Sequence, residues 1–488
     1  MGADNQDIQL AIFLACSAAI AIATYLKCRG KRQATDSRRD YFLAGGGLTW
    51  VFVAGSITLT NLSTDQLVGM NGNQMALLAW WELAAVAGLI ILAKGFLPIY
   101  YRHKCTTTTE LLERRYGNDS LRVLVSTLFL AGNLFIFMPV LLYTGSLVMK
   151  SMFGLGLPIL VIASAFAVVG AIYAIFGGLR AVAVSDTYSG ILLISMGIAV
   201  VYFSLSRIGF DLSGIPESRL TMIGSDDSPI PWHTLLTGMI FIQIFYWSTN
   251  QTITQRAMAA PNIREAQKGV FAAAAIRLVI VPPMIVIPGI VSFKLYGDIG
   301  DVAYGRIVAD VMPVWSTGLF AAAMAAAVLT SFNSILNSAT ALYVCDIHDR
   351  LFATDDPGQS VQKLSITVMV VIVVLSLVLV PIYDGTDSIV NLVQQLYGLL
   401  SMPILSAYLV GLAFDNVDHR SAVFALVAGV LIYGVFTFIW TPLHYIHLMF
   451  VTLICCVTLA LAANRIVFGK SVRLRIFGRT TDLSEEHA

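Results

Sequence analysis

Apolar residues gather along this chain into blocks of about 20 residues, separated by short polar stretches. A helix of about 20 residues crosses the hydrocarbon core of a bilayer, so each block predicts a membrane-spanning helix. The blocks number thirteen and lie at approximately residues 8–27, 48–71, 75–98, 119–149, 156–176, 182–206, 232–255, 266–293, 315–345, 362–382, 387–413, 420–440 and 444–467. The pattern therefore predicts an all-α integral protein of the cell (inner) membrane that crosses it many times.

Basic residues fall almost entirely on one side of this predicted membrane. With the N-terminus outside, inner segments hold 24 of the 30 Lys and Arg residues and outer segments hold five, while Arg277 lies inside the eighth span. This bias follows the positive-inside rule and predicts a cytoplasmic C-terminus. The first span follows an acidic stretch and not a basic start, so we expect it to be retained and not cleaved as a signal peptide. The outer loops 207–231 and 294–314 are expected to hold short amphipathic helices.

The composition narrows the class further. Hydrophobic residues make up 57% and charged residues 12% of the chain, against roughly 25% charged residues in soluble domains. No basic patch suggests a nucleic-acid partner, whereas membrane lipid is an expected one. The six cysteines have neither the spacing of a metal site nor that of a disulfide framework, and three of them are predicted near the cytoplasm, where disulfides are rare.

Two predicted spans contain runs of hydroxyl and amide side chains at mid-membrane. The second span holds such a run at 58–66, and the seventh holds one at 243–252. Interrupted helices at corresponding positions of two halves point to a transporter site built from inverted repeats. The alternative is that these side chains only join neighbouring helices by hydrogen bonds.

Glu82 in the third span and Arg277 in the eighth are the charges least explained by topology. Ionisable residues inside a membrane are costly and typically functional. Their opposite signs suggest that they are partners, either directly or through a polyhydroxy ligand; a purely structural ion pair is the alternative. Asn391, Gln394 and Gln395 in the eleventh span suggest a surface that faces a solute.

The ninth span carries two adjacent hydroxyls, Thr330 and Ser331, after an alanine-rich stretch. A small hard cation such as Na⁺ needs several oxygens, which these hydroxyls and the carbonyls of Leu59 and Leu62 in an unwound second span would supply. Alone, the two hydroxyls would bond back to their own helix. Asp186, near the start of the sixth span, is either on the route by which sodium leaves or a helix cap.

Several motifs along the chain carry a resemblance to a known family. They are found at 40–45, 61–70, 173–181, 246–247, 250–251, 255–256, 265–269 and 336–338. With them, the chain resembles the sodium:solute symporters from about residue 8 to 467, and among these the bacterial sodium/galactose and sodium/glucose cotransporters. The resemblance implies a leucine-transporter-like fold of five plus five inverted-repeat helices.

That resemblance also implies a domain organisation. Segment 1–47 would contain an additional N-terminal helix and a cytoplasmic loop. Segments 48–206 and 232–413 would be the two inverted repeats, joined by the extracellular loop 207–231. The remaining segments would be two C-terminal helices at 414–468 and a cytoplasmic tail at 469–488.

The resemblance assigns site residues as well. The co-transported sodium ion would be bound by Leu59, Leu62, Ala327, Thr330 and Ser331. The solute would be bound by Gln66, Glu82, Gln243, Arg277 and Gln394, and Asn250 is predicted to join them. The gates would be formed by Tyr246 on the inner side and by Met70, Trp81 and Val390 on the outer side.

The sequence departs from the galactose-transporter pattern at four places. An Asn of the site appears as Gln243, a Lys as Arg277, a nearby Ser as Ala85, and an outer-gate Phe as Val390. Lys and Arg are not interchangeable where geometry matters, and the fork of an Arg suits a carboxylate. These departures affect the identity of the solute and not the class of protein.

We therefore predict sodium-driven symport of a hexose such as galactose or glucose by alternating access. The alternative is sodium symport of another polyol or organic acid, such as inositol or a sugar acid, and a proton could replace sodium at sites made of hydroxyls. An enzyme is disfavoured because the seven histidines form no ligand or catalytic pattern. A sensor is disfavoured by the short predicted tail, and a channel by the lack of a repeated pore loop.

Overall fold

The computed structural model describes residues 3–28, 42–352, 361–385 and 388–475. This part of the chain is a bundle of helices with one small two-stranded sheet. The α-helices are α1 (Ala3–Cys28), α3 (Trp50–Asn61), α4 (Thr64–Gly72), α5 (Trp80–Ile91), α6 (Leu97–Arg102), α7 (Glu110–Tyr116), α8 (Ser120–Gly132), α9 (Met138–Phe153), α10 (Ile159–Arg207), α11 (Glu217–Leu220), α12 (Gly238–Ile244), α13 (Gln251–Met258), α14 (Ile263–Val279), α15 (Val281–Tyr296), α16 (Ala303–Val311), α17 (Val314–Ala341), α18 (Asp349–Leu351), α19 (Val361–Leu379), α20 (Ile389–Ala413), α21 (His419–Phe438) and α22 (Tyr445–Ile466).

Short segments of tighter or wider helix connect several of these elements. The π-helical turns are η3 (Leu92–Phe96), η4 (Asn133–Phe137), η6 (Phe245–Thr249) and η8 (Leu342–His348). The 3₁₀ turns are η1 (Ala44–Gly46), η2 (Ala76–Ala79), η5 (Trp232–Leu236), η7 (Gly300–Val302) and η9 (Val380–Tyr383). The antiparallel strands are β1 (Phe414–Asp415) and β2 (Arg473–Leu474). π-helical turns inside α-helices are frequent at functional sites, and η6 lies beside the cavity described below.

Ten helices in the described part of the chain are long and apolar enough to cross a membrane. They agree with ten of the thirteen predicted spans. The other three are the second span, the seventh span, and the fifth span, which is a shorter apolar helix over Ile159–Ile175. The protein is thus a multi-pass membrane protein, and its orientation stays a prediction from the charge bias.

The fifth and sixth predicted spans form one hydrogen-bonded helix, α10, and not two separate helices. The predicted break at about residue 180 is therefore wrong as a helix boundary. The hydroxyl of Tyr173 nonetheless donates to the carbonyl of Ala181 at 3.3 Å, which shows that the helix is not straight there. In a straight helix, residues eight positions apart are separated by about 12 Å along the axis, and a side chain leans toward the N-terminus. Tyr173 could therefore not reach Ala181 if α10 were straight.

The second and seventh predicted spans are interrupted, as their polar runs predict. In the second span, α3 ends and Leu62 and Ser63 leave the helical conformation (Leu62 ψ 81°, Ser63 φ −127°) before α4 begins. In the seventh, α12 continues into η6, and Asn250 is extended (ψ 123°) before α13 begins. The side chain of Asn250 accepts a hydrogen bond from the Thr252 amide at 2.9 Å, so it caps α13.

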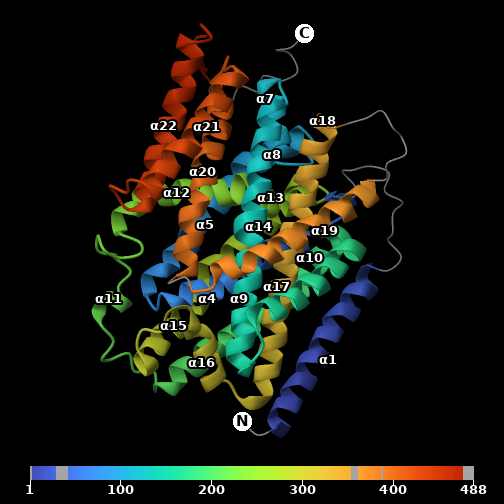
Figure 1. Cartoon of the computed structure of the whole chain (residues 1–488), viewed down its shortest axis with the longest axis vertical. Helices are drawn as coiled ribbons and strands as arrows, with labels where there is room; N and C mark the ends of the chain where they lie inside the picture. The colour runs from blue at the N-terminus through green and yellow to red at the C-terminus, as the bar shows by residue number, and fades with distance from the viewer. Residues whose placement is uncertain (1–2, 29–41, 353–360, 386–387, 476–488) are drawn as a thin grey trace.

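The two broken helices lie inside the bundle and the first helix lies at its edge. Helix α3 packs against α10 and α14, and α4 packs against α9 and α15. Helix α12 packs against α5. Figure 1 shows α1 at the edge of the bundle, where it lies alongside α10 and α17. The broken helices are therefore screened from lipid, the condition under which irregular backbone is tolerated at membrane depth.

The two long predicted outer loops carry short helices, as expected. Loop 207–231 contains α11, and loop 294–314 contains η7 and α16. Helix α16 is amphipathic: it buries Tyr304, Ile307 and Val308 and exposes Arg306.

Close packing of α5 against the second broken helix depends on Gly88. A Cβ atom at this position would lie 2.5 Å from the carbonyl oxygen of Gln243 and 2.8 Å from the ring of Trp247. We predict that Gly88→Ala destabilises the protein by about 1–3 kcal/mol, the usual cost of overpacking, and lowers its Tm in detergent by several degrees.

The matched control is Gly95→Ala, where the added Cβ would meet only Ile91, at 3.9 Å. Thermal unfolding of the two variants and the wild type by tryptophan fluorescence checks the prediction. Equal Tm values for the two variants would show that the α5–α12 contact tolerates an extra methyl group.

Candidate functional site

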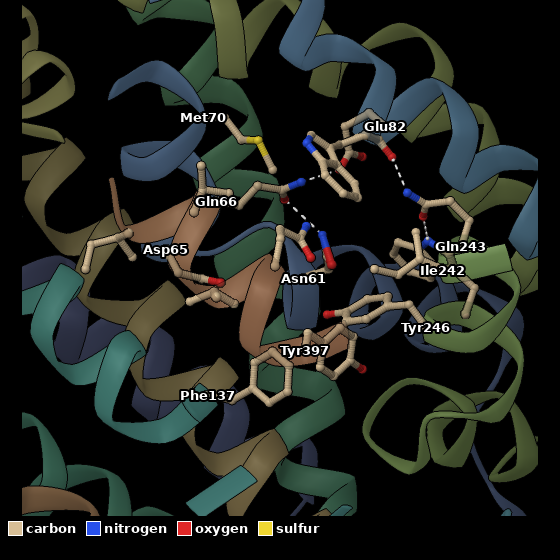
Figure 2. A pocket seen from close by; sticks show the side chains of 16 residues that line it. Asn61, Asp65, Gln66, Met70, Glu82, Phe137, Ile242, Gln243, Tyr246 and Tyr397 are labelled. Atoms are coloured by element: carbon tan, nitrogen blue, oxygen red, sulfur yellow. Dashed lines mark hydrogen bonds between the residues drawn. The ribbon is translucent and has the colours of Figure 1, made fainter. Parts of the chain in front are cut away.

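A cavity of about 90 Å³ lies between the two broken helices and α20, close to both interruptions. Drug-sized ligands occupy sites of roughly 300–1,000 Å³, so this cavity is smaller than a site for a drug-sized ligand. It is lined by Asn61, Asp65, Gln66, Met70, Trp81, Glu82, Phe137, Ile242, Gln243, Tyr246, Trp247, Ile389, Val390, Val393, Gln394 and Tyr397. Figure 2 shows these side chains converging on one space.

Glu82 and Arg277 form a direct ion pair, one of the two arrangements that the sequence suggests. Arg277 Nη1 donates to Glu82 Oε2, and both side chains are almost completely buried, with exposures of 0% and 2%. The other oxygen of Glu82 accepts from the amide of Gln66. Arg277 itself does not line the cavity but lies behind Glu82, with its guanidinium over the ring of Trp247, 4.4 Å from the centroid.

Arg277 also contacts the first broken helix. Its Nη2 donates to the carbonyl oxygen of Thr58 at 3.0 Å. Thr58 lies in the last turn of α3, just before the interruption. The guanidinium therefore joins the solute cavity to the backbone at the break, through Glu82 on one side and Thr58 on the other.

Gln243 is held in place by two hydrogen bonds to the indole-bearing residues around it. Its amide nitrogen donates to the carbonyl oxygen of Trp81 at 3.2 Å, and its oxygen accepts from the indole of Trp247 at 2.9 Å. The orientation of this amide is thus fixed before any solute enters. Its amide nitrogen also donates to the sulfur of Met239 at 3.7 Å, a weak acceptor.

One side of the cavity is lined by aromatic rings. Tyr246 lies edge-on to Tyr397, with ring centroids 5.9 Å apart, and Tyr397 lies edge-on to Phe137 at 4.8 Å. Asn250, predicted to bind solute, does not line the cavity. Its side chain is committed to the cap of α13 and to the hydroxyl of Tyr397, to which it donates at 2.8 Å.

The remaining predicted solute and gate residues are brought together. Gln66, Glu82, Gln243 and Gln394 line the cavity, as do Met70, Trp81, Tyr246 and Val390. The expected solute-facing surface in the eleventh span is reduced to Gln394, because Asn391 is not a lining residue and Gln395 is exposed on another face of α20. Adjacent residues of a helix point in different directions.

Two of the predicted sodium ligands meet across the first break, where the hydroxyl of Ser331 donates to the carbonyl of Leu59 at 3.2 Å. The hydroxyl of Thr330 instead donates back to the carbonyl of Ala327 in its own helix, also at 3.2 Å. Leu59, Leu62, Ala327, Thr330 and Ser331 are all buried. The hydroxyl of Ser63 reaches the same Ala327 carbonyl at 3.5 Å. Uncharged oxygens of this kind suit a small hard cation.

Asp186 lies beside this cluster of oxygens. It is fully buried, well inside α10, so it does not cap the start of a helix. One carboxylate oxygen accepts from Ser56 at 2.5 Å, and the carboxyl interacts with the hydroxyl of Thr330. The cap that the sequence left open as an alternative is therefore wrong for this residue.

Eight lining residues were not assigned a role from the sequence: Asn61, Asp65, Phe137, Ile242, Trp247, Ile389, Val393 and Tyr397. Asn61 is the most connected of them. It lies 3.0 Å from Gln66, and with its amide oxygen turned toward Arg277 it also donates to the Tyr246 hydroxyl at 2.9 Å. Asn61 and Asp65 belong to the polar run of the second span, so that run was the available signal.

A cavity between two interrupted helices, with a cluster of uncharged oxygens at the same break, is the arrangement typical of a cation-coupled secondary transporter. The chain belongs to the sodium:solute symporter family, whose family model matches residues 41–429. It is therefore a sodium-coupled solute symporter of the membrane, which is a transporter and not an enzyme.

Individual relatives agree with this assignment. The chain is 32% identical to an uncharacterized symporter, YidK, of Escherichia coli over 87% of its own length and 78% of that protein. It is 29% identical to a sodium/glucose cotransporter of Vibrio parahaemolyticus over 82% of its length and 80% of that protein.

A solved structure confirms the predicted leucine-transporter-like fold. A Na⁺-coupled sialic acid symporter, solved in a substrate-bound outward-open state, superposes with a TM-score of 0.82. The match covers 96% of this chain and 99% of that chain, at 19% sequence identity.

The contact of Ser331 with the first broken helix generates a prediction about sodium. We predict that Ser331→Ala raises the sodium concentration for half-maximal uptake by about tenfold or more, because a hydrogen-bond-strength contact to a charge is worth about 1.5–3 kcal/mol. Uptake into proteoliposomes as a function of external sodium measures the shift.

Ser338→Ala is the matched control for this variant. Ser338 is equally buried on α17, but its hydroxyl donates to Gln255 of α13 at 2.9 Å and not to the first broken helix. The same shift in both variants, or no shift in Ser331→Ala, would remove Ser331 from the sodium site.

Proposed function

We propose that this symporter uses the sodium gradient to carry a neutral sugar of hexose size into the cell. The observation that carries the proposal is the lining of the cavity, in which four amides, two carboxylates and a rim of aromatic rings surround one small space. Amides and carboxylates bind the vicinal hydroxyls of sugars, and aromatic faces pack on their apolar C–H surfaces. The similarity to a sodium/glucose cotransporter supports the same solute class.

The polar groups of the site have separate roles in this proposal. Gln66, Gln243 and Gln394 present amides to the solute, and Glu82 accepts from its hydroxyls while Arg277 holds that carboxylate in place. Tyr246 closes the inner side, and Met70, Trp81 and Val390 close the outer side. Asn250 acts indirectly, by holding Tyr397 and the start of α13.

Sodium binding is proposed to fix the shape of the break. The ion would be bound by the carbonyls of Leu59, Leu62 and Ala327 and the hydroxyls of Thr330 and Ser331, in exchange for the hydrogen bonds that these groups now make. Asn61 and Gln66, on either side of the break, would then be held toward the solute. Asp186 would receive the ion on its way to the cytoplasm.

Alternating access follows from two repeats that move against each other. We propose 48–206 and 232–413 as these repeats, each of which begins with one of the broken helices. Entry of one sodium ion down a potential of about 100 mV releases about 2.3 kcal/mol, and a tenfold gradient adds about 1.4 kcal/mol. Together these can concentrate a neutral solute by roughly 500-fold per ion.

The direct test is uptake of labelled solutes by proteoliposomes under an inward sodium or potassium gradient. We expect sodium-dependent accumulation of galactose or glucose, and weaker accumulation of inositol and proline. Sodium-dependent accumulation of a non-sugar, with none of a hexose, would keep the symporter and contradict the sugar.

Gln394 offers a second test with its neighbour as control. We predict that Gln394→Ala raises the KM for the hexose by about tenfold, because one hydrogen bond of about 1.4 kcal/mol to the solute is lost. Gln395→Ala changes an exposed side chain one position along the same helix and should leave KM as in the wild type. Equal KM values for the two variants would exclude Gln394 from the site.

A further inference from the structure

From the charges around the cavity we infer that Asp65 makes this symporter select against anionic solutes, so that it takes neutral or amino-bearing sugars and rejects sugar acids. The inference rests on the proposed function and narrows the class of solute that the site accepts. Three features of the molecule support it: the position of Asp65, the pairing of the other charges of the core, and the helix end on which Asp65 lies.

Asp65 lines the cavity and its carboxylate faces the solute space. Its side chain is partly accessible, unlike its completely buried neighbour Thr64. Figure 2 shows the Asp65 carboxylate turned into the cavity, toward the side where Asn61 lies. Among the described residues, no salt bridge is formed by this carboxylate.

The positive charges of the transport core are taken by other carboxylates. Arg277 pairs with Glu82 and donates to the carbonyl of Thr58. Arg256, fully buried on α13, interacts electrostatically with Asp186. The lining residues include no Lys, Arg or His in the described part of the chain. The solute therefore meets a surface with a net negative charge and no cation to bind a carboxylate.

The helix end that would otherwise attract an anion is also occupied. The N-termini of half-helices in broken transporter spans carry partial positive charge and bind anionic groups of substrates. Here the start of α4 is occupied by Asp65, whose carboxyl interacts with the backbone amides of Asp65 itself and Gln66. The start of α13 is capped in the same way by Asn250. The carboxylate of Asp65 thus occupies the position where the carboxylate of an acidic solute would bind.

The size of the effect is set by the repulsion of two like charges in a partly desolvated site. At about 6 Å and an effective dielectric constant of about 20, this repulsion corresponds to roughly 100-fold in affinity. Arg277 does not act as a clamp for a sugar acid in this arrangement, because Glu82 lies between it and the cavity.

The experiment is sodium-dependent uptake of glucose, glucosamine and glucuronate by proteoliposomes of the full-length protein, at matched solute concentrations. For the wild type we expect uptake of glucose and glucosamine, and a kcat/KM for glucuronate lower by roughly 100-fold. For Asp65→Asn, which keeps the shape of the side chain, we expect the ratio of glucuronate to glucose to rise at least tenfold. Asp65→Glu, which keeps the charge, should return the ratio toward the wild-type value.

The possible outcomes separate the role of Asp65 from the sugar symport on which it rests. Wild-type uptake of glucuronate equal to that of glucose would overturn the inference and keep the sugar symporter. An unchanged ratio in Asp65→Asn would remove Asp65 as its cause. If Asp65→Asn does not fold, the ratios of glucuronate to glucose uptake in the wild type and in Asp65→Glu still test the selection against anionic solutes. No uptake of any of the three solutes would overturn both the proposed function and the inference.

Discussion

Backbone polar groups at membrane depth must find partners, because no water is available there to satisfy them. This constraint governs the two broken helices of the symporter. At the first break, Ser331 donates to the carbonyl of Leu59 and Arg277 to that of Thr58. At the second, Asn250 caps the amide of Thr252. Each interruption is thus held by side chains of a different helix or of the break itself.

The same partners explain why a solute site and a cation site lie so close together. Residues two positions apart in a helix point to nearly opposite sides. At the end of α3, Leu59 faces the hydroxyls of α17, while Asn61 lines the solute cavity. In the proposed function, one short irregular segment would therefore present oxygens to a cation on one side and an amide to the solute on the other. A change in its shape affects both ligands.

The ion pair of Glu82 and Arg277 adds rigidity to this arrangement. A buried pair contributes little net stability, but loss of one partner leaves an uncompensated charge and costs about 3–5 kcal/mol. The pair also keeps the positive charge of Arg277 out of the solute space. Asp65 would then determine the charge that the solute meets, because Glu82 and Asp186 have cationic neighbours in Arg277 and Arg256.

Much of this arrangement is readable in the sequence, because membrane-embedded polar residues are costly and therefore conspicuous. The ten long helices, the two breaks and the Glu82–Arg277 pair follow from that rule. Positions that depend on side-chain direction do not. Gln394 and Gln395 are identical side chains at adjacent positions of one predicted span, so the sequence does not distinguish them, yet only Gln394 faces the cavity. Asn250 belongs to a polar run, yet its amide is used within the protein. The continuity of α10 could not be predicted, because a bend and a break leave the same pattern of residues.

The central claim is that sodium and solute both bind at the break in the first core helix, so that each affects the affinity for the other. Solute binding to the purified protein tests this claim most directly. The dissociation constant for the hexose would be measured by equilibrium binding in detergent, once in sodium and once in potassium at equal ionic strength. Coupling of about 1–3 kcal/mol, the usual range for linked sites, predicts about 5- to 150-fold tighter binding in sodium, and reciprocally tighter sodium binding in the presence of solute. Equal dissociation constants in the two salts would contradict the claim, even if the protein accumulated the sugar.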